Sequence, residues 1–231
     1  MPTLQEQFGQ IDIYLFDQLL RERIAPGSRI LDAGCGSGRN LVYFLREGYE
    51  VFAVDLDPLA IDDTRQMAAF FAPALPAANF RIEPIEAMSF PEAFANTVLL
   101  NAVLHFARDE AHFVAMVKGA WRVLAPGGIL FCRMASTIGM ERQIELVSGR
   151  HYLLPDGSER FLVDENFLMK ITAELGGELM DPLKTTMVQN QRAMTTWVVQ
   201  KTLCSETLRT RESGLYYPGH LSLGIRRSQK I

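Results

Sequence analysis

The chain has 231 residues, 48% of them hydrophobic and 22% charged, a balance that suits one globular domain with a full apolar core. Its formal net charge of −4 argues against a nucleic-acid-binding surface spread over the whole molecule, since such a surface needs clustered lysine and arginine. No apolar run reaches the ~20 residues that span a bilayer, so no membrane partner is expected.

The N-terminus and the cysteines indicate the compartment. A secretory signal has a basic region followed by an apolar one, and residues 1–6 do not begin such a pattern. The three cysteines are odd in number and follow no disulfide spacing, which favours a reducing compartment. We therefore expect a cytoplasmic protein.

Strands and helices alternate along the chain after a helical start. Apolar residues recur at helical spacing between residues 5 and 24, so residues 1–24 are predicted to form a helical cap. Expected strands cover residues 29–33, 50–55, 79–83, 96–101 and 128–134, and expected helices cover 38–47, 58–70, 109–123 and 163–175. This rhythm predicts a parallel sheet with helices on both faces.

Two extended stretches end the predicted domain, which covers residues 25–203. Residues 178–189 and 192–203 are rich in residues that favour strands, and the join at Asn190-Gln191 predicts an antiparallel hairpin between them.

Two further segments lie outside the predicted sheet. Residues 135–162 form a long connector, which in a compact domain is typical of a lid, a substrate-binding loop or a disordered segment. Residues 204–231 are low in aliphatic content and rich in serine and glycine, so we expect a poorly ordered tail.

A glycine-rich loop follows the first predicted strand. The strand ends in Asp32, and glycine stands at Gly34, Gly36 and Gly38, so the backbone can approach a ligand without side-chain obstruction. The dinucleotide fingerprint G-x-G-x-x-G needs glycine at its sixth place, where this chain has Arg39. The pattern D-x-G-x-G-x-G therefore disfavours a nicotinamide-dependent oxidoreductase.

This loop resembles that of the class I S-adenosylmethionine (SAM)-dependent methyltransferases, and three later segments agree with the family in order and spacing. Val51-Phe-Ala-Val-Asp55 is similar to its second strand, which ends in an acid. Val98-Leu-Leu-Asn-Ala-Val-Leu-His105 is similar to its fourth strand and the turn beyond. Trp121-Arg-Val-Leu-Ala-Pro-Gly-Gly128 is similar to its L-x-P-G-G corner.

The resemblance covers roughly residues 25 to 201. It implies an α/β fold, a single Rossmann-like three-layer domain whose mostly parallel seven-stranded sheet ends in an antiparallel hairpin. It also implies a methyltransferase activity with SAM as cofactor and S-adenosylhomocysteine as product.

The resemblance implies that the loop glycines face the methionine part of SAM and that Asp32 lies near its ammonium group. The alternative for Asp32 is a carboxylate that only holds the loop. Asp55 and the following Leu56 stand at the end of the second strand, where an ionised acid can accept both ribose hydroxyls. Asp57 competes for this role, but its place before Pro58 suits a helix cap.

Adenine recognition in the family often uses an acid-containing turn after the third strand. Glu83-Pro-Ile-Glu-Ala-Met-Ser-Phe90 occupies that place, and Pro84 stands where the acid is common. Either Glu86 takes the place of this acid in contacting the adenine amino group, or backbone groups at Ile85 and Glu86 make that contact. The alternative for Glu86 is an ordinary solvent-exposed turn residue.

Polar residues at the ends of the fourth and fifth strands are candidates for contact with the acceptor. Asn101 ends the fourth strand, where its carbonyl would meet the ammonium and its side chain the substrate. His105 follows one helical turn later, where a neutral imidazole would accept a proton from a nucleophile. The alternative for His105 is packing beneath the connector with a backbone hydrogen bond.

Arg133 ends the fifth strand and would bind an anionic substrate, with a salt bridge to a nearby acid as the equal alternative. His151, in the connector beside Arg150, is a second candidate substrate contact. No Cys/His cluster has metal-binding spacing, so no metal is expected.

The sequence thus predicts transfer of a methyl group to a small-molecule acceptor by one in-line displacement, with alignment and exclusion of water as the main contribution of the protein. There is no separate substrate domain, and Asn101-Ala-Val-Leu stands in place of the N-P-P-Y-like motif of amino-adenine methylation. The G-C-G-x-G-R-N loop and G-Y-E-V also resemble compact bacterial methyltransferases of the tellurite-resistance type. A non-catalytic SAM-binding regulatory or scaffold protein is the alternative, and the oligomeric state stays open.

Overall fold

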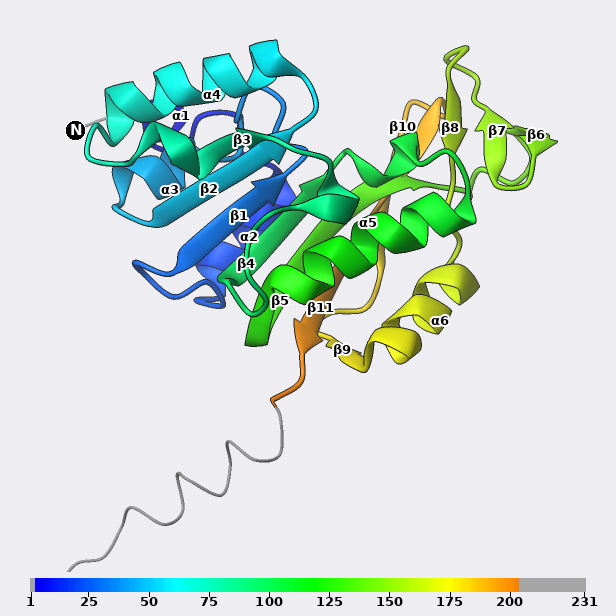
Figure 1. Ribbon diagram of the computed structural model, residues 1–231. Coiled ribbons are helices and arrows are strands. Elements are labelled where there is room, and N and C mark those ends of the chain that lie inside the picture. The colour runs from blue at the N-terminus through cyan, green and yellow to red at the C-terminus, as the bar shows by residue number, and fades with distance from the viewer. Residues whose placement is uncertain (1–2, 204–231) are drawn as a thin grey trace, which may run out of the picture.

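A twisted sheet with an antiparallel edge forms the centre of the molecule, and the computed structural model describes residues 3–203 (Figure 1). The strand order is β3-β2-β1-β4-β5-β11-β10, with β9 paired to β11. The bounds of these strands are β1 Arg29–Ala33, β2 Glu50–Asp55, β3 Phe80–Ile82, β4 Ala95–Asn101, β5 Leu124–Ser136, β9 Gly177–Leu179, β10 Lys184–Val188 and β11 Arg192–Lys201. The first five strands are parallel, and β11 runs antiparallel to its neighbours.

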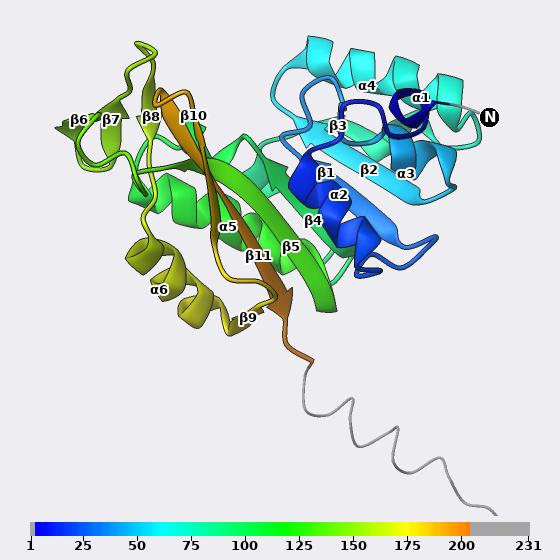
Figure 2. The same ribbon diagram turned by 180° about the vertical axis from the view of Figure 1, so that it is seen from behind.

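Helices cover both faces of this sheet. Their bounds are α1 Leu4–Phe8, α2 Ile13–Leu20, α3 Val42–Arg46, α4 Pro58–Phe71, α5 Glu110–Val123 and α6 Glu165–Leu175. Figure 1 shows α5 and α6 in front of the sheet, and Figure 2 shows α2 on the opposite face. The predicted Rossmann-like α/β fold with a terminal antiparallel hairpin is confirmed.

Two apolar cores lie on the two faces of the sheet because neighbouring strand residues alternate between them. Leu31 and Leu100 pack with residues of α5 and α6, whereas Ile30 and Leu99 pack with residues of α2, α3 and α4. All four of these strand side chains are fully buried. Burial on both faces explains why these strands appear in the sequence as continuous apolar runs.

The predicted stretch 178–189 is divided into two strands, β9 and β10, which both pair with β11, and two other predicted elements begin at a different residue. The helix expected from residue 38 begins only at Val42, because Gly38 has a φ of 76° and its amide closes a turn with the Cys35 carbonyl instead. The fifth strand begins at Leu124, before the expected start, and its pairing with β4 shifts register between Ala95 and Thr97 to accommodate the Pro-Gly-Gly corner.

The long connector folds into a small sheet of its own. Strands β6 (Glu145–Ser148), β7 (His151–Leu153) and β8 (Glu159–Phe161) pair antiparallel in chain order. This sheet lies beyond the carboxyl ends of the parallel strands, beside β10 (Figure 1). Its role as a lid stays a prediction, and the tail predicted for residues 204–231 lies outside the described residues.

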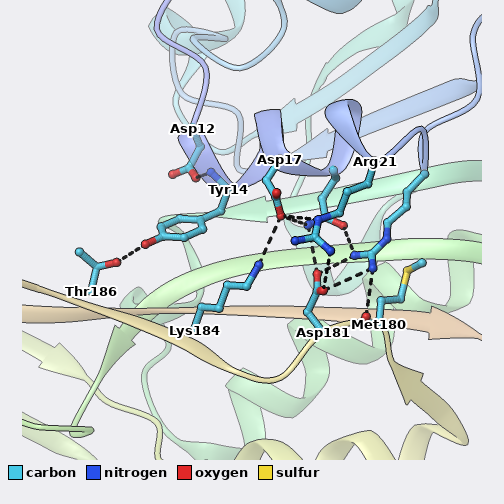
Figure 3. Close-up of polar contacts among 10 residues, drawn as sticks. Asp12, Tyr14, Asp17, Arg21, Met180, Asp181, Lys184 and Thr186 are labelled. Atoms are coloured by element: carbon cyan, nitrogen blue, oxygen red, sulfur yellow. Dashed lines mark hydrogen bonds and ion pairs between the residues drawn. The ribbon is translucent and has the colours of Figure 1, made fainter.

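Helix α2 is tied to the antiparallel edge by polar side chains (Figure 3). Tyr14 is hydrogen-bonded to Thr186, and Asp17 forms an ion pair with Lys184 at 3.3 Å. Arg23, which follows this helix, donates to Asp181 at 2.6 Å. These contacts join elements more than 150 residues apart in the chain.

Within residues 3–203, no helix combines the length and the apolar character needed to cross a bilayer.

We expect Asp181→Ala to lower the free energy of unfolding by about 1–3 kcal/mol at pH 7, because Arg23 loses its charged partner. Burial opposes ionisation of Asp181, but hydrogen bonds from Arg23 and Gln18 outweigh it and lower the pKa of the carboxyl below its usual 3.8. A lowered pKa contributes stability above the unfolded value, which is lost as the pH falls through the folded one. The difference between variant and wild type should therefore shrink below pH 4 in urea denaturation.

The matched control is Asp62→Ala, which removes an exposed partner of Arg65 within one helix. Exposed pairs contribute about 0–1 kcal/mol, so this variant should stay close to wild type. Equal losses for the two variants would contradict the proposed anchoring of α2.

Candidate functional site

Two cavities lie at the carboxyl ends of the parallel strands, the edge where open α/β sheets bind ligands. The apolar cavity has a volume of about 130 Å³, and its lining includes Gly34, Asp55, Leu56, Ile85, Glu86 and Phe106. The arginine cavity has a volume of about 470 Å³, and its lining includes Arg39, Ala102, His105, Phe106, Arg160 and Arg192. Phe106 lines both cavities, so they adjoin one another.

The glycine loop is fixed to the ends of β1 and β2 by hydrogen bonds. The Gly34 amide donates to the Val54 carbonyl at 2.8 Å, and the Gly36 amide donates to Asp55 Oδ2 at 2.8 Å. Thr64 Oγ1 on α4 donates to the Gly36 carbonyl at 3.0 Å. The loop is therefore held in place before any ligand arrives.

The three loop glycines differ in what surrounds them. A Cβ at Gly34 would lie 2.5 Å from Val103 Cγ2, and one at Gly38 would lie 2.4 Å from Met67 Cε. A Cβ at Gly36 would meet nothing within 4 Å. Gly34 and Gly38 thus permit close packing of the loop, whereas Gly36 borders open space.

Asp32 is a buried carboxylate whose Oδ2 has no hydrogen-bond partner among the described residues. Burial raises its pKa to about 7, and the charge of Arg39 lowers it less than burial raises it. A buried carboxylate without a partner is costly. Asp32 is therefore placed to receive a cationic group from a ligand.

The end of β4 carries a second unsatisfied side chain. Both polar atoms of the Asn101 side chain are buried without a partner among the described residues. The next residue, Ala102, has a φ of 60°, and its amide donates to the Arg133 carbonyl at 2.7 Å. Strained backbone and orphaned polar atoms cluster at functional sites.

Asp55 and Asp57 divide the two roles that the sequence left between them. Asp55 accepts from Gly36 with one oxygen and from the Asp57 amide with the other at 3.0 Å. Asp57 caps α4 by accepting from the Leu59 amide at 2.9 Å. Each Asp55 oxygen keeps acceptor capacity for a ligand hydroxyl, while Asp57 is occupied as a cap.

The turn after β3 supplies Ile85 and Glu86 to the apolar cavity. Glu86 Oε1 lies 3.3 Å from His112 Nε2, so its carboxylate is not simply solvated. His112 and Met116 of α5 also line this cavity, one helical turn apart. We did not predict either as a site residue, although their spacing places them on one face of the helix.

His105 lines the arginine cavity, and its Nδ1 accepts a hydrogen bond from the Ala135 amide at 3.4 Å. Burial and the charges of Arg160 and Arg192 lower the pKa of the ring to about 4, so it is neutral at pH 7. With Nδ1 as acceptor, the proton of the neutral ring resides on Nε2. The backbone hydrogen bond named as the alternative is thus present.

Arg133 forms the salt bridge that was the alternative to substrate binding, and its binding of an anionic substrate stays a prediction. Its Nη1 lies 3.1 Å from Oδ2 of the buried Asp12, and its guanidinium lies 5.4 Å from the centre of the Tyr14 ring. The same side chain lines the arginine cavity. A salt bridge therefore holds the guanidinium at the cavity wall.

His151 is not brought to the site, which corrects its predicted substrate contact. Its Nε2 lies 3.0 Å from the Arg108 carbonyl and its Nδ1 lies 3.2 Å from Glu159 Oε1, and it lines neither cavity. The pairing of β7 with β8 turns it toward these partners. Nor does any group of three or more His, Cys, Asp or Glu side chains within residues 3–203 form a metal site.

We expect Asp32→Asn to raise the melting temperature at pH 8 by several degrees without added ligand. The pKa of Asp32 is raised from 3.8 to about 7, so its favourable contribution to folding is complete below pH 4 and lost as the pH rises through 7. The melting difference between variant and wild type should grow from pH 4 to pH 7 and then level off. A difference independent of pH in thermal scans would contradict this.

Residues 31–132 match the family model described as a methyltransferase domain. A ubiquinone biosynthesis O-methyltransferase of Methylocella silvestris is 38% identical over 117 residues, which cover 49% of this chain and 43% of that protein. The first curated relatives are matched over about half of their own length or less.

Solved structures share the fold over more of the chain. A SAM-dependent methyltransferase of Methanosarcina mazei has a TM-score of 0.63 at 19% identity, covering 80% of this chain and 97% of that one. The 1,6-didemethyltoxoflavin-N1-methyltransferase of Burkholderia thailandensis has a TM-score of 0.63 at 20% identity, covering 84% and 80%. Residues 31–132 thus match a methyltransferase domain, and the chain shares its overall fold with these solved structures.

Proposed function

We propose that the protein is a SAM-dependent methyltransferase that acts on a small molecule. One observation carries the proposal: the buried Asp32 has an unpartnered oxygen below a glycine loop that leaves open space at Gly36. The match to a methyltransferase domain supports it, as does the Burkholderia thailandensis structure, which holds S-adenosylhomocysteine on the same fold.

The residues present fit SAM part by part. Asp32 and Asn101, with their unsatisfied polar atoms, would hold the methionine ammonium group. Each Asp55 oxygen already accepts one hydrogen bond from a backbone amide, and its remaining lone pair would accept a hydrogen bond from a ribose hydroxyl. Leu56, Ile85 and the other walls of the apolar cavity would hold the adenine.

Bound SAM supplies a methyl group on a positively charged sulfur and leaves as S-adenosylhomocysteine. The protein contributes position, since the glycine loop and β4 end are held rigidly by hydrogen bonds. The connector sheet forms one wall of the arginine cavity through Arg160, which helps to exclude water from the acceptor.

His105 enters the proposal as a hydrogen-bond donor that positions the acceptor. Its Nδ1 is engaged by the Ala135 amide, so Nε2–H remains for a ligand. Proton acceptance, one of the two roles that the sequence left open for His105, would require the opposite tautomer.

A small acceptor fits the arginine cavity, whose volume of about 470 Å³ lies in the range of small-molecule sites. The name of the Methylocella silvestris relative places that protein in ubiquinone biosynthesis, which supports a small-molecule acceptor for this chain. The narrower likeness to tellurite-resistance enzymes and the cytoplasmic location stay predictions. A panel of thiols, phenols, amines and chalcogen oxyanions would identify the accepting atom.

Isothermal titration with SAM and S-adenosylhomocysteine, with NAD(H) as the control, tests the cofactor. We expect micromolar binding of the first two and none of the third. Methyl transfer from labelled SAM to any acceptor of the panel separates the enzyme from a non-catalytic SAM-binding protein. A folded sample that binds neither SAM nor S-adenosylhomocysteine would refute the proposal.

Asp55→Ala should weaken SAM binding by about 1–3 kcal/mol, or roughly 5–150-fold, because ribose hydrogen bonds and the anchor of Gly36 are lost. The control is Asp57→Ala, which removes the α4 cap and costs about 1 kcal/mol of stability. That variant should keep its affinity for SAM. Equal affinities for the two variants in calorimetry would exclude a ribose contact for Asp55.

His105→Ala should lower turnover about tenfold, the effect of one lost hydrogen bond in the transition state, and leave SAM affinity unchanged. His105→Gln should restore part of the rate, because an amide can donate but cannot act as a base at this pH. Two results together would assign His105 the role of base instead. The glutamine variant would be as slow as the alanine variant, and the wild-type rate would depend on pH through the deprotonation of a single group.

A further inference from the structure

The arginine cavity carries an excess of positive charge that the cofactor site does not use. Four guanidinium groups line it, and they come from distant parts of the chain. Arg39 follows the glycine loop, Arg133 lies in β5, Arg160 lies in β8, and Arg192 begins β11. Asp156 is the acidic residue of the lining.

Two of the four arginines already have an anionic partner. Asp12 lies behind the wall, 3.1 Å from Arg133 and 3.9 Å from Arg39, and its side chain is only 3% exposed. Its charge offsets part of theirs and fixes Arg133 in place.

The other two arginines, Arg160 and Arg192, have no ion pair within residues 3–203. Arg160 donates to the Glu159 carbonyl at 2.6 Å and lies 5.0 Å from the Phe106 ring centre, contacts that orient it without neutralising it. Hydrogen bonds from the hydroxyl and the amide of Ser158 to Oδ1 lower the pKa of Asp156, and the charges of Arg192 and Arg160 lower it further. Four positive groups against Asp156 and Asp12 leave two positive charges unbalanced.

The field of these two arginines reaches the wall shared with the apolar cavity. After burial, Arg160 and Arg192 are the causes that lower the pKa of His105, whose ring packs 4.6 Å from that of Phe106. Arg160 is half-buried and Arg192 is exposed, so water screens part of their field, but their place on the wall of one cavity adds their charges at the same point. A neutral or cationic acceptor would gain nothing from this arrangement, whereas an oxyanion would.

We propose that the methyl acceptor is a small molecule with an oxyanion group, a carboxylate or a phosphate, which Arg160 and Arg192 recognise. The proposal rests on the proposed methyltransferase function. Guanidinium groups match both oxyanions through paired N–H donors, and His105 Nε2–H adds a further donor beside them. Arg160 and Arg192 thus act as specificity residues on the side of the cavity formed by β8 and β11.

Calorimetry on protein saturated with S-adenosylhomocysteine tests this with three probes of similar shape. Benzoate carries a carboxylate, phenyl phosphate carries a phosphate, and benzamide is neutral. We expect at least one anion to bind tenfold or more tightly than benzamide, and the stronger of the two identifies the oxyanion. Benzamide binding as tightly as both anions would overturn the proposal.

The variant Arg160→Gln/Arg192→Gln should lose at least tenfold in affinity for the preferred anion. The control is Arg142→Gln, which alters an exposed arginine of the same connector that does not line the cavity. Unchanged affinity in the double variant, or equal loss in the control, would also overturn the proposal. The affinity for S-adenosylhomocysteine should be unchanged in both variants, which shows that they fold.

The failures of the two proposals are distinguishable. If S-adenosylhomocysteine does not bind but benzoate or phenyl phosphate still binds through Arg160 and Arg192, the anion site stands and the methyltransferase function falls. If S-adenosylhomocysteine binds and neither anion does, the acceptor class is wrong and the cofactor site stands.

Discussion

The hydrogen bond from the Gly36 amide to the Asp55 carboxylate is the contact on which the site depends. It ties the glycine loop to the end of β2, while Thr64 on α4 holds the same residue through its carbonyl. Because the loop cannot relax, Gly36 keeps open space before it and Asp32 stays buried beneath without a partner. Rigidity of the loop therefore preserves the unsatisfied carboxylate that a ligand can use.

Two buried aspartates show how charge is managed in this protein. Asp12 caps α2, lies close to Arg133 and Arg39, and helps to fix the N-terminal helices at the site. Asp32 lies in the strand next to the loop and has Arg39 only as a more distant charge. The first is satisfied and serves structure. The second is held at a free-energy cost, which is typical of a functional residue.

The arginine cavity, the proposed acceptor site, is assembled from segments that surround the parallel sheet. The connector brings Arg160, the hairpin brings Arg192, and the turn after β4 brings His105 to one cavity. The cofactor side comes almost entirely from residues 31–132, which match the methyltransferase domain model. Arg160 and Arg192, which we propose to recognise the acceptor, therefore lie outside the residues that match the family model.

Local signals in the sequence determined the ends of β1 and β2, the glycine loop and the helix cap at Asp57, because each depends on residues within a few positions of one another. They also placed Asp55 and Asn101 at one edge of the sheet. Only the tertiary structure decided that His151 turns away, that His112 enters the apolar cavity and that arginines converge on the other. These outcomes depend on contacts between distant residues, such as the Asp12–Arg133 pair separated by 121 positions, and no local pattern encodes which distant side chains will meet.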